Sequence, residues 1–432
     1  MKDLKILADD VLSRLKIAGA DDGGVKISSG YCSELNVDGG EISLLRTIFS
    51  DSVAIKVIKD KRKGTITINS FDDEEIDEAV RLCMESVDAG IADDAVSISP
   101  LTENGDFEDG INVPDKEKLF MRLQEYMEDM ARDYPQIIIE QVIVTYSYGE
   151  FCLANTNGVC YTSKGGSYSF SSMFSAHDGD KTTSFNSVGF DLLDLDKPFI
   201  EMYGSREYYD RCIKELDAKP LEGKFVGKVL ASPDMVSEFV GTAIGCFMSD
   251  GPLIEKTSPW IDKLGEKVVS EKLTVRSIPL DERMICSSKI HADGYKNENA
   301  DYITDGVLKA FDLSDYGAKK TGGVRFPSSS GCTEIPGGKT PLQDLIKSID
   351  KGIFICRFSG GEPASNGDFS GVAKNSFMIE NGEITHALTE TMISGNIEDM
   401  LNNIIDFSSE TVCDGSSVLP YGLFDGLTVS GK

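Results

Sequence analysis

The chain has 432 residues, of which 40% are hydrophobic and 27% charged, a composition typical of a soluble globular protein with two or three domains. Its formal net charge of −29 at pH 7 argues against nucleic acid as a partner, because phosphate recognition needs clustered lysine and arginine. The only basic cluster, Lys59–Lys63, is better interpreted as a hairpin turn. The ten cysteines are scattered with no CxxC pair, which argues against a zinc ribbon and fits a reducing, cytoplasmic compartment.

Neither a targeting segment nor a membrane span is expected. Residues 1–12 contain three aspartates and lack an uninterrupted apolar core, so they do not resemble a signal peptide. No window approaches the roughly 18 apolar residues that a membrane-spanning helix needs. We therefore expect no membrane partner.

The N-terminal half begins with an amphipathic helix over residues 2–18. A two-residue alternation through 25–70 then predicts an antiparallel meander of strands. A second helix starts at residues 71–73. After a polar loop at 99–113, a third helix is expected from Pro114 to about Arg132.

The next segment, residues 136–190, is strand-like and rich in Ser, Tyr and Gly, and its Asn157-Gly158 dipeptide predicts a hairpin. A fourth helix is expected over 199–216. We place the domain boundary at 218–220, which gives an N-terminal domain of residues 1–217, with a sub-boundary near 99–113, and a C-terminal domain of residues 218–432. The predicted fold class is α+β: an N-terminal antiparallel sheet with helices, then a β-rich C-terminal domain containing one buried helix.

That buried helix is expected within residues 224–269. An apolar run of strand length precedes Ser232-Pro233, and a serine cap with proline in the first turn is a helix start. Apolar pairs then recur every four residues, and Gly251 is the predicted stop. Gly241 and Gly245 lie four apart on one face, so we expect another backbone to approach closely there.

Beyond this helix the sequence is β-rich. Strands are expected over 273–278, 302–313, 352–359, 376–380, 383–393 and 427–430. Residues 317–338 form a long Gly/Ser/Lys-rich stretch, which in a compact domain is either functional or disordered. A last helix is expected over 396–405, with Asn396 as its cap.

The order of short motifs in this half resembles the C-terminal domain of the TldD/PmbA (TldE) family. In chain order the motifs are the strand and Ser-Pro helix, Ser258, Lys263–Val268, Asp305–Lys309, Gly367–Ser370, Ile379–Ile384 and Ile393–Asn396. Looser matches at residues 37–41 and 157–158 extend the likeness over nearly the whole chain. The resemblance implies a cytoplasmic, metallopeptidase-related protein. The family has also been called a modulator of DNA gyrase, although this sequence gives no physical reason for direct DNA contact.

The family has two branches, which differ in the buried helix. In the TldD branch this helix carries HExxxH, followed by Glu-Gly-Asp, and binds a catalytic metal. If residues 248–250 are the counterpart of Glu-Gly-Asp, the HExxxH positions fall at Val240, Gly241 and Gly245, none of which can ligate a metal or move a proton. The chain thus resembles the PmbA/TldE branch. We expect no cofactor in this chain and zinc in a partner subunit.

Independent metal sites have weak support in the sequence. The three histidines are His177, His291 and His386. His177 with Asp178 and Asp180 could surround a cation, but a solvated loop is the simpler interpretation, and the same holds for the other two, with His386 half-buried on a strand. Cys413 lies near a cysteine ligand of the metal-binding branch, yet a lone thiolate makes no catalytic zinc site.

Several functions therefore stay open. The first is a non-catalytic subunit of a TldD/TldE-type metallopeptidase that processes peptides and unfolded chains, as a heterodimer with a metal-bearing paralogue or as a homodimer when alone. The second is a stand-alone, catalytically silent peptide-binding or structural protein. The third is an independent hydrolase with a metal at His177 or His291. Gly367, Asp368, Phe369 and Ser370 are either a peptide or partner contact or a turn that joins two strands.

Overall fold

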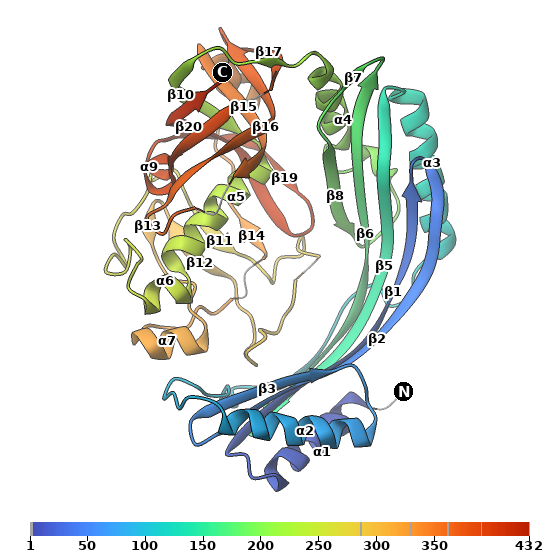
Figure 1. Cartoon of the computed structure of the whole chain (residues 1–432), viewed down its shortest axis with the longest axis vertical. Coiled ribbons are helices and arrows are strands. Elements are labelled where there is room, and N and C mark those ends of the chain that lie inside the picture. Colours follow the sequence, from blue (N-terminus) through green and yellow to red (C-terminus); the bar gives the residue numbers. More distant parts are fainter. Residues whose placement is uncertain (1–2, 286, 329–330, 361–362, 390, 432) are drawn as a thin grey trace.

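The computed structural model describes residues 3–285, 287–328, 331–360, 363–389 and 391–431. The chain forms two sheets with their own helices, and the predicted α+β class is confirmed (Figure 1). No described helix is long and apolar enough to cross a membrane.

The N-terminal half is built on a sheet of order β3-β2-β1-β5-β6-β4, with β7 and β8 paired to β6. Its elements are α1 (Leu4–Ile17), β1 (Asp22–Asp38), β2 (Glu41–Lys59), β3 (Arg62–Ile68), α2 (Asp73–Asp88), β4 (Gly105–Gly110), α3 (Lys116–Asp133), β5 (Ile137–Asn155), β6 (Cys160–Asp178), β7 (Lys181–Thr182), β8 (Asn186–Leu192), η1 (Phe199–Glu201), α4 (Ser205–Lys214) and η2 (Glu215–Asp217). The meander and the turn at residues 59–63 are as predicted, with Asp60 and Lys61 at positive φ.

Two helix pairs cover one face of this sheet, at its opposite ends. On β1, Val25 and Ile27 pack with α1 and α2, whereas Leu35 and Val37 pack in the core that includes α3 and α4. All four positions share the two-residue period of a strand, so they lie on the same face. The opposite face is left for the C-terminal half.

The C-terminal half contains a ring of strands. β10 (Lys224–Ala231) pairs with β15 (Lys351–Gly360) and β20 (Ser417–Ser430), and β16 (Asp368–Glu380) and β18 (Met392–Asn396) close the circuit between β15 and β20. Alternate residues face two cores: one contains α5 (Pro233–Ala243) and the other α8 (Leu342–Lys347). The predicted buried helix is therefore present.

The remaining elements of this half are β9 (Lys219–Pro220), the π-helical turn η3 (Ile244–Met248), α6 (Asp250–Ile254), β11 (Val275–Ser277), β12 (Ala300–Thr304), β13 (Val307–Leu308), α7 (Asp315–Thr321), β14 (Thr333–Glu334), β17 (Glu383–Thr389), α9 (Ile397–Asn402) and β19 (Ile404–Cys413). The cap of α9 is Asn396, as predicted.

Several predicted elements are wrong in extent. The polar stretch 99–113 contains β4, which pairs in parallel with β6. The helix expected over 199–216 is broken into η1, α4 and η2, with Gly204 in the left-handed region. The strand expected over 302–313 is a short hairpin that turns at Asp305-Gly306, both at positive φ.

Two further corrections concern the expected loop and the last helix. The stretch 317–338 begins inside α7, because Ser314 caps a helix there. The helix expected over 396–405 stops at Asn402, and β19 begins at Ile404. Polar side chains of β19 hid its strand pattern, since three consecutive residues in it are exposed.

Candidate functional site

The helix at the centre of the site starts as the sequence predicts and ends differently. Ser232 caps α5 by accepting from the Met235 amide at 3.4 Å, and Pro233 occupies the first turn. The α-helix ends at Ala243, a π turn follows, and Ser249 adopts extended angles. Gly251, the predicted stop, instead lies inside α6. A π turn cannot be told from an α turn by apolar spacing alone.

One stripe of α5 and its π turn is open to solvent. Asp234, Glu238, Gly241 and Gly245 recur every three or four residues and are all exposed. The expectation that a backbone packs on the two glycines is wrong, because a Cβ built on either meets no atom within 4 Å. Val240, in contrast, is 3% exposed and belongs to the main C-terminal core.

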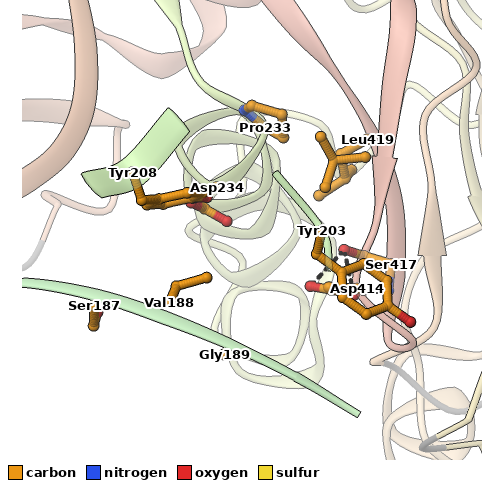
Figure 2. A pocket seen from close by; sticks show the side chains of 11 residues that line it. Ser187, Val188, Gly189, Tyr203, Tyr208, Pro233, Asp234, Asp414, Ser417 and Leu419 are labelled. Carbon is orange, nitrogen blue, oxygen red and sulfur yellow. Dashed lines mark hydrogen bonds between the residues drawn. The ribbon is translucent and has the colours of Figure 1, made fainter. Parts of the chain in front are cut away.

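Three cavities follow this stripe. The first, of about 180 Å³, lies between Asp234 and Asp414 (Figure 2). The second, about 190 Å³, is shared by Asp234 and Glu238, and the third, about 420 Å³, extends from Glu238 past Phe369. Figure 2 shows Tyr208 beside Asp234, and its hydroxyl donates to the Asp234 carboxylate at 2.7 Å. The Asp234 end of the stripe thus faces cavities whose far wall belongs to the N-terminal half, whereas the cavity beyond Glu238 is lined by the C-terminal half.

The second cavity holds the most perturbed carboxyl group of the site. Burial raises the pKa of Glu215 to about 7, against the lowering effect of hydrogen bonds from Asn375 and Asn186. Asn375 donates to both Glu215 oxygens, at 3.0 and 2.9 Å, and so joins η2 to β16. Desolvation between the cavity walls also raises the pKa values of the Asp234 and Glu238 carboxyl groups. A set of carboxyl groups with raised pKa values in a groove is a feature of functional sites.

Two arginines line or border the same cavity. The Arg211 guanidinium lies 4.5 Å from the ring centre of Tyr208. Arg357 donates to the Phe185 carbonyl at 2.9 Å and stacks on the Phe185 ring at 4.2 Å. These contacts tie β15 to the segment before β8. The groove therefore offers carboxyl, amide and guanidinium groups, which can bind the main chain and ends of a peptide.

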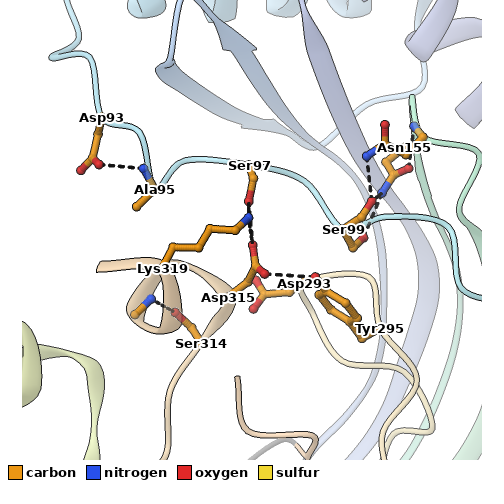
Figure 3. A network of polar contacts seen from close by, with 12 residues as sticks. Asp93, Ala95, Ser97, Ser99, Asn155, Asp293, Tyr295, Ser314, Asp315 and Lys319 are labelled. Carbon is orange, nitrogen blue, oxygen red and sulfur yellow. Dashed lines mark hydrogen bonds and ion pairs between the residues drawn. The ribbon is translucent and has the colours of Figure 1, made fainter. Parts of the chain in front are cut away.

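A polar network connects the two halves at another place. Figure 3 shows Lys319 of α7 reaching between Ser97 and Asp315, to which it pairs at 2.9 Å. The Asp315 carboxylate also accepts from Ser97 at 2.6 Å and from Tyr295 at 3.0 Å. In the same N-terminal segment, hydrogen bonds lower the pKa of the Asp93 carboxyl group to about 2. The larger effect comes from the Ala95 amide and the next from the Lys320 side chain. Lys319 and Lys320, at the start of the stretch 317–338, thus connect the C-terminal half to residues 93–97 of the N-terminal half.

A larger groove than the three cavities along α5, of about 740 Å³, lies between the middle of the N-terminal sheet and residues 279–285 and 287–289. The sheet side is lined largely by small residues: Ser28, Ser29, Gly30, Ser50, Ser52, Ser147, Gly149, Ser163, Gly165, Gly166 and Ser167. Such small side chains leave room for an extended chain over this face of the sheet. The Ser/Gly richness of this sheet was visible in the sequence, but its place in a groove was not.

The predicted contact motif at 367–370 lies against the π turn. A Cβ on Gly367 would come 2.7 Å from Phe247, so only glycine fits there, and its φ is +87°. Asp368 accepts from Asn396 at 2.9 Å, and Phe369 packs against Phe239 of α5. These three residues hold the helix end in place. Phe369 also lines the third cavity, whereas Ser370 is exposed on β16, and contact of the motif with a peptide stays a prediction.

The predicted HExxxH positions do not fit a metal ion. Gly241 and Gly245 have no donor atoms, and Val240 is an apolar core residue. Within the described ranges, no three His, Cys, Asp or Glu side chains are grouped closely enough to hold a metal. That this chain works without a metal stays a prediction, and metal analysis must test it.

The other predicted ligands lie apart from one another. His177 contacts Ser175 and Thr182 through Nε2, at 3.0 and 3.3 Å. Burial lowers the pKa of His291, which accepts the Asp293 amide at 3.0 Å. His386 is half-buried on β17, as predicted, and the Cys413 sulfur lies 4.0 Å from the Arg283 carbonyl oxygen.

Together these features define a two-part protein in which a curved sheet faces a ring of strands across a groove, with one helix stripe exposed to it. Three family models match the chain: PmbA/TldA metallopeptidase domain 1 at residues 27–87, the central domain at 108–215 and the C-terminal domain at 223–431. The chain belongs to the PmbA/TldD family of metalloprotease-related proteins.

Individual relatives agree with this assignment. The metalloprotease PmbA of Escherichia coli O157:H7 is 23% identical, over 96% of this chain and 95% of its own. A zinc metalloprotease TldD homologue of Saccharolobus solfataricus is 26% identical over 56% of this chain and 57% of its own. Among solved structures, TldE from Thermococcus kodakarensis superposes with a TM-score of 0.84 at 20% identity, over 98% of this chain and all of that one. A Bacteroides thetaiotaomicron protein described as a proposed modulator of DNA gyrase superposes at 0.87 with 22% identity over both whole chains.

The helix of the site was predictable from the sequence, but most groups around it were not. Asp234 and Glu238 carried a usable signal, since acids at a four-residue spacing on an otherwise apolar helix mark its open side. Glu215, Asn375 and Arg357 carried none, because residues this far apart in sequence meet only through the tertiary fold.

Proposed function

We propose that this chain is the non-catalytic subunit of a PmbA/TldD-type metallopeptidase, in which a metal-bearing paralogue cleaves peptides and this chain forms part of the cleft. The observation that carries the proposal is the open stripe of α5. Asp234 and Glu238 line the groove, Gly241 and Gly245 continue the same exposed stripe, and none of the four offers an imidazole to a metal. A relative named as a zinc metalloprotease TldD homologue supports a zinc-bearing partner in a heterodimer.

The substrate class we propose is an extended peptide or unfolded chain. The groove of about 740 Å³ is lined by small residues of long strands, which leave room for an extended chain to lie over the sheet. The two glycines leave the helix surface free for a peptide backbone. The nine described cysteines are free thiols, which supports a cytoplasmic location for this reaction.

The first experiment measures metal content and cleavage of an unfolded protein for the lone chain, the HExxxH paralogue and their mixture. We expect no stoichiometric zinc in the lone chain, no cleavage by it, and cleavage that appears or rises in the mixture. Stoichiometric zinc and chelator-sensitive cleavage by the lone chain would overturn the proposal and favour the independent hydrolase with a ligand such as His177 or His291.

A second candidate is a stand-alone, catalytically silent peptide-binding protein. It rests on the same groove of about 740 Å³, with peptide binding but no cleavage as its function. Fluorescence anisotropy with a labelled unfolded peptide separates the two candidates. Tight binding by the lone chain, with no change in the paralogue's cleavage rate on mixing, favours the stand-alone protein.

A further inference from the structure

The exposed stripe of α5 leads to a place where hydrogen bonds join the two halves of the chain, here named the closed end. Tyr208 donates to Asp234 at 2.7 Å, and Asn375 donates to Glu215 at 2.9 Å. All four residues line the second cavity, and the Tyr208–Asp234 pair also lines the first, so its bond stands between the two (Figure 2). An extended chain that runs along the stripe from its glycines meets these bonds beyond Glu238, which suits a chain terminus better than an internal segment.

Glu238 is the carboxyl group that the closed end leaves uncompensated. It lines both the second and the third cavity. Burial raises its pKa, and within the described part of the chain neither a hydrogen bond nor a nearby cation acts in the opposite direction. A partly buried carboxylate in this state gains free energy when a cation binds to it.

The positive groups of the second cavity are, in contrast, engaged within the chain. Arg357 donates to the Phe185 carbonyl at 2.9 Å and stacks on the Phe185 ring. The Arg211 guanidinium stacks on the Tyr208 ring at 4.5 Å and lies 3.8 Å from the Glu207 carboxylate. The closed end therefore favours the amino terminus of a peptide over its carboxylate terminus.

The third cavity places an aromatic floor beside Glu238. It has a volume of about 420 Å³ and is lined by Phe239, Phe358 and Phe369. The ring centres of Phe239 and Phe369 are 5.8 Å apart, and those of Phe358 and Phe369 are 5.9 Å apart. Phe358 is only half-buried in the folded chain. An apolar side chain that enters this cavity buries its surface against these rings.

We propose that the closed end binds the amino-terminal residue of a peptide. The Glu238 carboxylate accepts from the terminal ammonium group, and an apolar first side chain lies on the aromatic floor of the third cavity. The main chain continues over Gly241 and Gly245, where a Cβ would meet no atom within 4 Å. The inference rests on the proposed function, whose substrates it narrows to peptides with a free amino terminus and an apolar first residue.

Fluorescence anisotropy with the lone chain tests the contact with the ammonium group. The probe is a short peptide of alternating glycine and serine that begins with leucine and carries fluorescein on the side chain of a C-terminal lysine. We expect the parent to bind this peptide at least about tenfold more tightly than its N-acetylated form, since acetylation removes a hydrogen bond between charged groups. Glu238→Gln should bind both forms equally. The control Glu128→Gln, at an exposed glutamate of α3, should keep the difference.

Two further arms test the first side chain. With glycine in place of the leucine, the parent should bind about tenfold more weakly, because the apolar surface of one leucine is no longer buried. Thr242→Trp, at a residue that lines the third cavity, should remove this preference and keep that for the free amino group. An acetylated peptide that begins with lysine carries its ammonium group on a side chain instead. It should bind no better than the acetylated leucine peptide.

Several results would overturn the inference. They are equal binding of the free and acetylated peptides by the parent, a Glu238→Gln variant that keeps the difference, and no binding of the free peptide at millimolar concentration. If the acetylated lysine peptide binds as tightly as the free leucine peptide, the site takes a lysine side chain and not a chain terminus. None of these measurements reads cleavage, so the inference can fail while the mixture with the paralogue still cleaves an unfolded protein, and the reverse.

Discussion

Replacing Gly241 with alanine should stabilise the protein. Gly241 lies inside α5 with a negative φ, and a Cβ there meets no atom within 4 Å. Glycine in a helix interior costs up to about 1 kcal/mol relative to alanine, chiefly through backbone entropy. Because the added methyl group displaces no neighbouring atom, Gly241→Ala should recover most of that free energy of unfolding. For a unit of the size of the C-terminal half this corresponds to a rise of about 2–4 °C in unfolding midpoint.

Gly317 provides the matched control, because it too is a helical glycine with a negative φ. In α7 a Cβ at this position would overlap the Asp250 carboxylate, which accepts from the Ser314 amide at 2.9 Å. Gly317→Ala must displace that carboxylate, so it should lower the free energy of unfolding by about 1–3 kcal/mol. The two substitutions are chemically identical and have opposite expected signs.

Differential scanning calorimetry on the parent and both variants gives the answer. Because a chain of this size need not unfold in one step, each transition is compared with its own counterpart in the parent. A fall in midpoint for Gly241→Ala, similar to that for Gly317→Ala, would refute the reasoning, since it would mean that the space beside Gly241 is filled in the folded protein.

Three further predictions concern the groove, the π turn and the exposed stripe of α5. Glu215→Gln should leave the free energy of unfolding unchanged below pH 4.5 and raise it at pH 8 by up to about 3 kcal/mol. The reason is that the pKa of Glu215 rises from 4.5 to about 7 on folding, so ionisation of the carboxyl group penalises the folded state. Equal midpoint shifts at pH 4.5 and 8 would contradict this. Ser258→Ala should lower the free energy of unfolding in urea by about 1–3 kcal/mol, because the Ser258 hydroxyl donates to the buried Phe247 carbonyl of the π turn at 2.6 Å. Thr242→Ala, which removes an exposed hydrogen bond of 2.8 Å, should cost almost nothing. Similar costs for both would show that the Ser258 bond does not hold the π turn. Gly241→Phe should lower cleavage by the mixture with the paralogue and Glu75→Phe, on the exposed side of α2, should not; unchanged cleavage in both would remove α5 from the peptide path.

Local signals predicted the elements whose geometry is decided by a few neighbouring residues. The Ser232-Pro233 start of α5 and the Asn396 cap of α9 are side-chain-to-backbone bonds within three residues, so they were visible in the sequence. The same holds for the turn at 59–63. The extent of the strands was less visible, because β2 runs unbroken through exposed residues that show no clean alternation.

The site itself was only partly predictable. Apolar spacing identified the buried side of α5 but treated its glycines as packing positions, because a missing side chain is equally consistent with close approach and with open space. The π turn that moves the end of the helix from Gly251 to Ser249 leaves no mark in the spacing. The bonds from Asn375 to Glu215 join residues 160 positions apart, so they follow from the tertiary fold alone.

The two glycines of the stripe point to something that the folded chain alone does not explain. Together they cost up to about 2 kcal/mol of helix stability. Elsewhere in the protein such a cost is offset by packing, as at Gly317 of α7, where the Asp250 carboxylate fills the space of a Cβ. At Gly241 and Gly245 no described atom occupies that space. Residues that lower helix stability and make no compensating contact in the folded chain are expected at functional sites. The stripe therefore fits a surface that a peptide or a partner subunit covers during function.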